Sequence, residues 1–210
     1  MESRCVKVSI SLSRPPTHSL TTAQNLKARM ARMKSSVNPL FTDITWGAGG
    51  STSGLSMDLG IHLHTTGHTS NLHMTCTNIQ GSADPVADIR TALQQAKDAG
   101  IRNIVALRGD PPAGEEEWKA TEGGFSCALD LVKFMKQEFG DAFGISVAGY
   151  PEGHPNAISK VEDVSKLTAA ELARSSTCDG ETFTCLDADY KKEMDYLKEK
   201  IDAGGGTLTD

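Results

Sequence analysis

The sequence lacks any run that approaches the ~18–20 consecutive apolar residues of a membrane-spanning helix. It also lacks the pattern of a signal peptide, because the charged start Met1–Lys7 is not followed by an apolar segment of useful length. These two absences exclude a membrane span and favour a cytoplasmic location without a membrane partner.

Paired cysteine motifs and basic clusters are missing as well. The five cysteines are an odd number and none belongs to a Cys-x-x-Cys pair, which favours reduced thiols. There are 21 Lys and Arg against 27 Asp and Glu, so the formal net charge is −6. Since no basic cluster is interleaved with aromatic residues, we expect no nucleic-acid partner.

Two common phosphate-binding fingerprints are absent too. The segment 45–52 joins an apolar run to four residues rich in glycine, but Thr52 occupies the third glycine position of G-x-G-x-x-G. No Gly-Lys-Ser/Thr follows. Backbone N–H groups of such a loop can approach a phosphate, but the failed spacing favours an ordinary tight turn.

What the sequence does contain is a regular alternation of apolar runs and amphipathic stretches. Strands are predicted at 40–46, 71–76, 101–107 and 145–148, with a weaker one at 6–11. Helices are predicted at 82–100, 129–139, 161–173 and 190–202, with a polar insertion at 174–187. The clearest of these is the helix that begins with Ser82–Pro85, because an N-cap and a proline precede apolar residues at helical spacing.

This alternation predicts an α/β fold with a parallel sheet. Periodicity leaves open whether the sheet is an open doubly wound one or a (β/α)₈ barrel. A barrel needs eight units, and only about five strands are recognisable, so a barrel built from this chain would be incomplete.

Polar residues at strand ends are the candidate functional groups. Arg108-Gly109-Asp110 ends a strongly apolar strand, where an Arg can pair with phosphate and an Asp can orient a polar group. An Arg–Asp pair in a type I turn at Pro111 is the structural alternative. His73 and His154 lie near the ends of two other strands and could converge on the same face.

The remaining histidines do not predict a metal site. His62, His64 and His68 lie close together, but no carboxylate or cysteine stands at ligand spacing from them. We interpret them as a solvated helix end. The lysines of 190–202 alternate with acidic residues and indicate a charged helix face.

Four motifs, in order along the chain, together resemble the eukaryotic type of methylenetetrahydrofolate reductase. They are FTDITWGAGGS at 41–51, HMTC at 73–76, NIVALRGDPP at 103–112 and VAGYPEGHP at 147–155. The resemblance covers 24–204, which we expect to form a partial catalytic barrel of this family. Residues 1–23 and 205–210 are expected to be divergent end segments.

The resemblance implies an incomplete (β/α)₈ TIM barrel with about five of its eight units. It also implies an FAD enzyme of one-carbon metabolism and methionine biosynthesis, which uses NAD(P)H to reduce 5,10-methylenetetrahydrofolate, its small-molecule folate substrate, to 5-methyltetrahydrofolate. Matching residue by residue, the FAD contacts fall on Thr45, His73, Arg108, Gly109, Asp110, Ala128, Tyr150, His154, Glu193 and Lys200. Asp110 is also the candidate catalytic residue, because it would face the folate pterin.

The chain departs from the family pattern at three places. Cys127 stands where the family usually has an aromatic residue, and Leu12 stands where the family has its general-acid Glu. A leucine cannot donate a proton, and loss of a positioned acid typically costs ~10²–10⁴ in rate. After Gly204 the family sequence is not followed, so we expect strands 6–8 and the pterin-binding Gln to be missing.

These departures define an alternative hypothesis. In it the chain is a non-catalytic family fragment that only binds flavin or associates with full-length subunits. An open parallel sheet edge would favour such an association.

Overall fold

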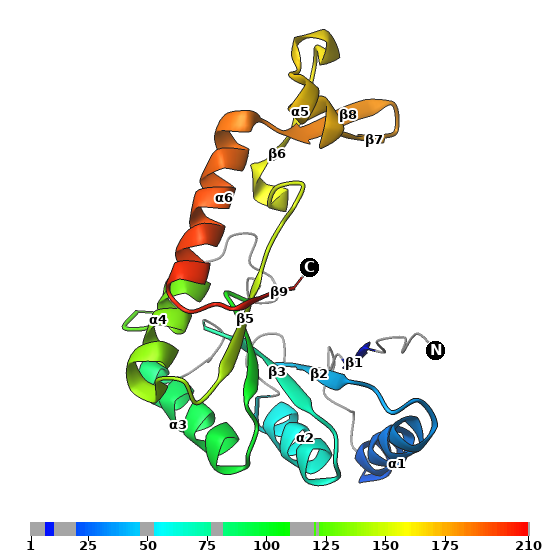
Figure 1. Cartoon of the computed structure of the whole chain (residues 1–210), viewed down its shortest axis with the longest axis vertical. Coiled ribbons are helices and arrows are strands. Elements are labelled where there is room, and N and C mark those ends of the chain that lie inside the picture. Colours follow the sequence, from blue (N-terminus) through cyan, green and yellow to red (C-terminus); the bar gives the residue numbers. More distant parts are fainter. Residues whose placement is uncertain are drawn as a thin grey trace.

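The computed structural model describes residues 7–10, 20–46, 53–76, 82–109, 120 and 122–209. Its main element is a parallel sheet of six strands in the order β1-β2-β3-β4-β5-β9 (Figure 1). The strands are β1 (Lys7–Ile10), β2 (Phe41–Thr45), β3 (Ser70–Thr75), β4 (Asn103–Leu107), β5 (Gly144–Ala148) and β9 (Thr207–Thr209). Because every pair of neighbouring strands is parallel, the carboxyl ends of all six strands lie at one edge.

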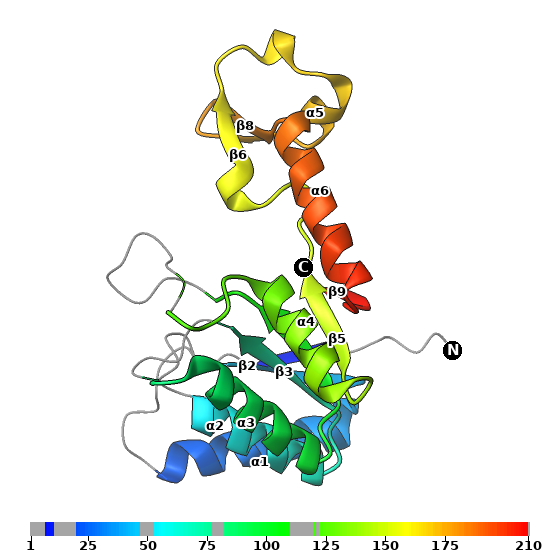
Figure 2. The same cartoon turned by 90° about the vertical axis from the view of Figure 1, so that its left-hand side faces the viewer.

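Five long helices alternate with these strands. They are α1 (Leu20–Val37), α2 (Ser53–Thr65), α3 (Pro85–Asp98), α4 (Ala128–Phe139) and α6 (Asp187–Asp202). Figure 2 shows α1, α2 and α3 along one side of the sheet. None of the helices in the described part of the chain combines the length and the apolar character needed to cross a bilayer. The expected α/β class with a parallel sheet is confirmed.

The core lies between the sheet and the helices. Ile44, Leu72 and Ile104 occupy matching places on β2, β3 and β4, and each is 0% exposed. Side chains alternate between the two faces of a strand, so Asp43, Thr45, Asn71 and His73 lie on the opposite face. The apolar residues thus fix the sheet against the helices and turn the polar set away from them.

The helix α3 forms as its sequence predicts. Asp84 Oδ1 accepts a hydrogen bond from the Ala87 N–H at 3.0 Å, and Pro85 occupies the first turn. Ile89 and Leu93 are buried on the inner face. Gly100 follows with φ +90°, a conformation that suits glycine and ends the helix.

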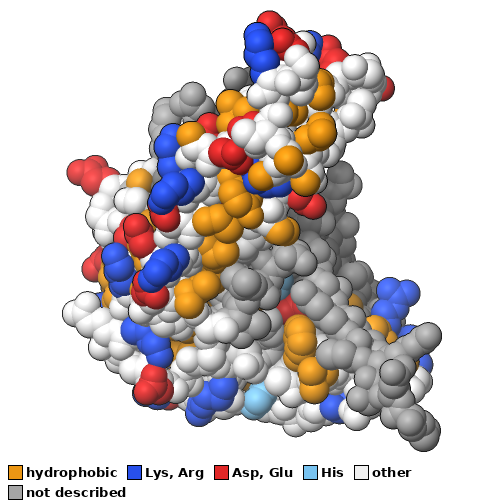
Figure 3. All heavy atoms as spheres, turned by 45° about the horizontal axis from the view of Figure 1, so that its top comes forward, with side chains coloured by type: hydrophobic (Ala, Val, Ile, Leu, Met, Phe, Trp, Pro, Cys, Tyr) orange, Lys and Arg blue, Asp and Glu red, His pale blue; other side chains and the backbone are white. Residues whose placement is uncertain are grey.

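A smaller antiparallel sheet lies between β5 and α6 in the sequence. It consists of β6 (Ile158–Val161), β8 (Glu181–Cys185) and β7 (Ser176–Cys178), in the order β6-β8-β7. It stands at the upper end of the molecule in Figure 1, away from α1, α2 and α3. Figure 3 shows hydrophobic side chains on the surface of this upper part, where Ile158, Leu172 and Leu186 are among the exposed residues.

The predicted helix at 161–173 is wrong. Only the 3₁₀ turns η2 (Pro155–Ala157) and η3 (Val164–Lys166) and the short helix α5 (Ala169–Ala173) form near it. The reason is local, because two polar side chains each cap a new turn. Asp163 accepts from the Ser165 N–H, and Thr168 forms a capping box with Glu171.

The polar insertion at 174–187 contains a β-hairpin. Its turn is Asp179-Gly180, with φ +52° and +78°, which joins β7 to β8. Asp-Gly is a strong signal for a two-residue hairpin turn, so the sequence did carry this information.

The expectation that strands 6–8 are missing after Gly204 is wrong for the first of them. β9 pairs in parallel with β5, with Val147 opposite Leu208. Gly205 makes this approach feasible, because a Cβ there would lie 2.8 Å from both Val147 Cγ1 and the Lys200 carbonyl oxygen. The described part of the chain therefore contains six parallel strands, one more than the sequence indicated.

The contact between α2 and β3 gives a matched test of the core. A Cβ at Gly60 would lie 2.7 Å from Leu72 Cδ2, whereas nothing lies within 4 Å of a Cβ at Gly54 in the same helix. We expect Gly60→Ala to lower the free energy of unfolding by about 1–3 kcal/mol through overpacking. Gly54→Ala should be neutral or stabilising by up to about 1 kcal/mol. Urea unfolding of both variants measures this, and equal effects would contradict the packing described.

Candidate functional site

The candidate site lies at the carboxyl edge of the main sheet. Thr45 ends β2 and lies opposite His73 of β3 in the register. Arg108 directly follows β4, and Tyr150 follows β5 by two residues. The strand order therefore brings four of the sequence-predicted residues to one edge, where ligand sites of parallel α/β proteins form.

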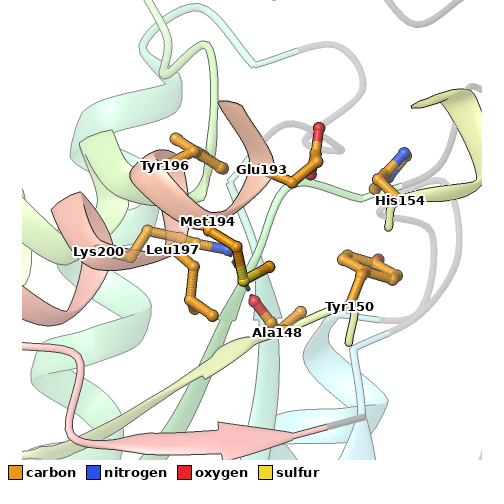
Figure 4. Close-up of a pocket in the computed structure, with 9 residues that line it drawn as sticks. Ala148, Tyr150, His154, Glu193, Met194, Tyr196, Leu197 and Lys200 are labelled. Carbon is orange, nitrogen blue, oxygen red and sulfur yellow. Dashed lines mark hydrogen bonds between the residues drawn. The ribbon is translucent and has the colours of Figure 1, made fainter. Parts of the chain in front are cut away.

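A pocket beside this edge joins the segment after β5 to α6. Its lining residues are Ala148, Gly149, Tyr150, His154, Glu193, Met194, Tyr196, Leu197 and Lys200. In Figure 4, Tyr150 and His154 face the α6 side chains across the cavity. The empty space among these residues is about 280 Å³, which includes space open to solvent. Four predicted residues, Tyr150, His154, Glu193 and Lys200, are thus brought together from segments about 40 residues apart in the chain.

Lys200 is anchored in this pocket. Its Nζ donates a hydrogen bond to the Ala148 carbonyl at 2.7 Å and lies 4.6 Å from the centre of the Tyr196 ring. The residue is only 5% exposed. Burial lowers the pKa of Lys200, and the nearby carboxylate of Glu193 opposes that shift. The ammonium group is therefore held in place at the end of β5.

The pKa of His154 depends on the charged groups around it. Its Nδ1 accepts from the Asn156 N–H at 3.1 Å, and its ring meets Tyr150 edge-on at 4.7 Å. Burial lowers the pKa of His154; Glu193 raises it, and Arg108 and Lys200 lower it further. Arg108, Glu193 and Lys200 are therefore close enough to act on one imidazole, and two of the three are cations.

The ring of His73 is held by a contact with the neighbouring strand β2. Its Nε2 lies 3.0 Å from Oδ1 of Asp43, a carboxylate that is fully buried. Asn71 Nδ2 donates to the same oxygen at 2.6 Å. The His73 side chain is 19% exposed, so part of the ring reaches the surface of the site.

Tyr196 is a site residue that the sequence analysis missed. Burial and a side-chain hydrogen bond with Cys127 both raise the pKa of Tyr196. The family resemblance leads us to expect an aromatic residue at position 127, where this chain has Cys127. The ring of Tyr196 lies beside that position. The helical spacing Glu193, Tyr196, Lys200 places all three on one face of α6 and could have revealed it.

Some of the other predicted residues lie in the described part of the chain and some lie outside it. Ala128 is the first residue of α4 and is buried, and Gly109 adopts φ +100° directly after Arg108. Asp110 and Leu12 lie outside the described residues, so the catalytic prediction and the lost general acid stay predictions.

The interpretation of the His62–His68 segment as a solvated helix end is wrong for one residue. His68 is 4% exposed, and its Nδ1 lies 3.1 Å from Thr42 Oγ1. It is therefore a buried residue that is hydrogen-bonded to Thr42 of β2. Within the ranges that the structure describes, no group of three or more His, Cys, Asp and Glu side chains could hold a metal ion.

The charges around His154 predict that two substitutions shift its pKa in opposite directions. Lys200→Met removes a cation that lowers the pKa of His154, so the pKa should rise. Glu193→Gln removes an anion that raises it, so the pKa should fall. NMR titration of the His154 ring measures both. Lys198→Met is the control, because exposed Lys198 pairs with Asp202 and should leave the His154 pKa unchanged. Shifts of the same sign in the first two variants would contradict the described site.

Comparison of the sequence with known proteins gives matches to one family. The family model described as "Methylenetetrahydrofolate reductase" matches residues 2–174. "Methylenetetrahydrofolate reductase (NADH) 1" of Zea mays is 42% identical over 186 residues, which cover 88% of this chain and 27% of the relative. "Methylenetetrahydrofolate reductase 2" of Saccharomyces cerevisiae is 42% identical over 184 residues, covering 87% and 25%.

A more distant relative is the "Probable methylenetetrahydrofolate reductase (NADPH)" of Caenorhabditis elegans. It is 35% identical over 187 residues, which cover 86% of this chain and 22% of the relative. The chain thus spans about a quarter of the length of these curated relatives. The match of the family model to most of the chain establishes that it belongs to the methylenetetrahydrofolate reductase family.

Proposed function

We propose that this chain builds the FAD site of a reductase that uses NAD(P)H to convert 5,10-methylenetetrahydrofolate to 5-methyltetrahydrofolate. The observation that carries this proposal is the gathering of Tyr150, His154, Glu193 and Lys200 around one pocket. All four are positions where the family resemblance leads us to expect FAD. The charge of Arg108, which acts on His154, adds a fifth such position to the same edge.

The chemistry of these side chains suits FAD. Its diphosphate is anionic, and Arg108 and Lys200 bring two cations near one imidazole. Asn71 Oδ1 and Thr75 Oγ1 are buried polar atoms with no hydrogen-bond partner among the described residues. A donor and an acceptor group are therefore available on β3 for a polar ligand.

The pocket has room for part of the cofactor. Its empty space of about 280 Å³ includes space open to solvent, so the pocket is smaller than the ~300–1,000 Å³ of typical ligand pockets and would enclose only a part of FAD. We assign the rest of the cofactor contacts to Thr45, His73 and Gly109 at the neighbouring strand ends.

Each group then has a distinct part in the proposed activity. When bound, FAD supplies the chemistry that accepts a hydride from NAD(P)H and passes it to the folate. The residues of this chain hold it: Lys200 and Arg108 balance negative charge, and Tyr150 and His154 form an aromatic wall. Asp110 is proposed to face the pterin.

Leu12 favours a second candidate function. Because leucine occupies the position of the family's general acid, the chain would bind flavin and accept hydride without reducing the folate efficiently. The two candidates share the cofactor site and differ only in the second half of the reaction.

The cofactor site is tested by the visible absorbance of the purified chain after incubation with FAD and removal of free cofactor. We expect a retained flavin band. Arg108→Ala should weaken FAD binding about 10–100-fold, the equivalent of one charge-assisted hydrogen bond. Arg102→Ala is the matched control, because exposed Arg102 lies at the other end of β4 and donates to the carbonyls of Lys97 and Ile101. A folded chain that retains no flavin would refute the proposal.

Anaerobic half-reactions separate the two candidates. Loss of the flavin band on adding NAD(P)H, followed by its return on adding 5,10-methylenetetrahydrofolate, would support the complete reductase. Loss without return would support the second candidate. Replacing Leu12 by Glu should then restore the return of the band.

A further inference from the structure

A buried carboxylate beneath the site has no part in the function described so far. Asp43 is 0% exposed in the middle of β2, two residues before Thr45. It lies on the face of the sheet opposite to Ile44 and the helices. Its carboxylate contacts Asn71 and His73 of the neighbouring strand β3.

The fold alone does not call for a carboxylate here. Burying a charge is costly and leaves less stability than an apolar side chain of similar size would give. Hydrogen bonds to Asp43 Oδ1 offset part of that cost, and among the described residues they come from Asn71 Nδ2 at 2.6 Å and His73 Nε2 at 3.0 Å. Of these two donors, His73 belongs to the predicted FAD contacts, and its side chain is 19% exposed, whereas Asn71 is buried.

We propose that Asp43 is a positioning residue of the ligand site, which fixes the ring and the tautomer of His73. An ionised carboxylate can only accept hydrogen bonds, so His73 Nε2 must carry the proton that it shares with Oδ1. When the ring is neutral, its lone pair is then on Nδ1. Asn71 supports the arrangement, because its donation to Oδ1 holds the carboxylate in register with β3.

This assignment specifies what His73 can recognise. In its neutral form, with Nε2 protonated, His73 offers an acceptor at Nδ1, and this form selects a ligand O–H or N–H group over a phosphate oxygen. The role therefore deepens the proposed function and rests on it for the identity of the ligand. Sugar-alcohol hydroxyls and the ring N–H of a flavin are groups of this class.

The tautomer can be measured in the ligand-free chain. Long-range ¹H–¹⁵N NMR at mildly alkaline pH distinguishes protonated from unprotonated ring nitrogens of His73. We expect Nε2 to be protonated and Nδ1 to be bare in the unmodified chain. A bare Nε2, or an even mixture of tautomers, would overturn the proposal whether or not the chain binds FAD.

Three variants extend the test to ligand binding. Asp43→Ala should give a tautomer mixture at His73 and weaken FAD binding about tenfold, as loss of a supporting hydrogen bond does in other sites. Asp43→Asn keeps an oxygen acceptor and should restore the single tautomer and most of the affinity. FAD affinity is measured by quenching of flavin fluorescence.

Thr42→Val is the control for lost stability. Thr42 is equally buried on the same strand and contacts His68, but it lies on the face toward the helices. It should leave the His73 tautomer and FAD affinity unchanged. If Asp43→Ala and Thr42→Val lower FAD affinity equally while the His73 tautomer stays fixed, Asp43 is merely structural and the proposal fails.

Discussion

The structure depends on the alternation of side chains along β2, β3 and β4. Ile44, Leu72 and Ile104 face the helices, and this apolar contact fixes which side of the sheet is the core. A slip of one residue would expose them and bury the polar set instead. The same register places Asp43 beside Asn71, and Thr45 beside His73. Core packing and site geometry are therefore set by one constraint.

The segment between β5 and α6 adds the second wall of the site. Tyr150 and His154 precede the small antiparallel sheet, and Glu193 and Lys200 follow it on α6. The bond from Lys200 to the Ala148 carbonyl ties α6 back to β5 across this excursion. Gly205 then allows β9 to run beside β5. The Lys200 bond and the β5–β9 pairing thus hold α6 beside β5 on either side of the excursion.

The elements with regular apolar spacing were predicted from the sequence, and those that depend on a few turn residues were not. Helix α3 and strand β4 were predictable because caps and apolar spacing agree with their final burial. The Asp179-Gly180 hairpin and β9 were missed, since each rests on a few residues with unusual backbone freedom. The family resemblance predicted His73 and Lys200, which the structure places at the carboxyl edge of the sheet and in the pocket. It did not point to Asp43 or Tyr196, because their contacts are with residues distant in sequence.

The most direct measurement of the central claim is a crystal structure of the chain with FAD. The account predicts FAD at the carboxyl edge of the sheet, between the segment after β5 and α6, with Lys200 and Arg108 in contact with its diphosphate. FAD bound elsewhere, with Lys200 and Arg108 making no contact to it, would contradict the account.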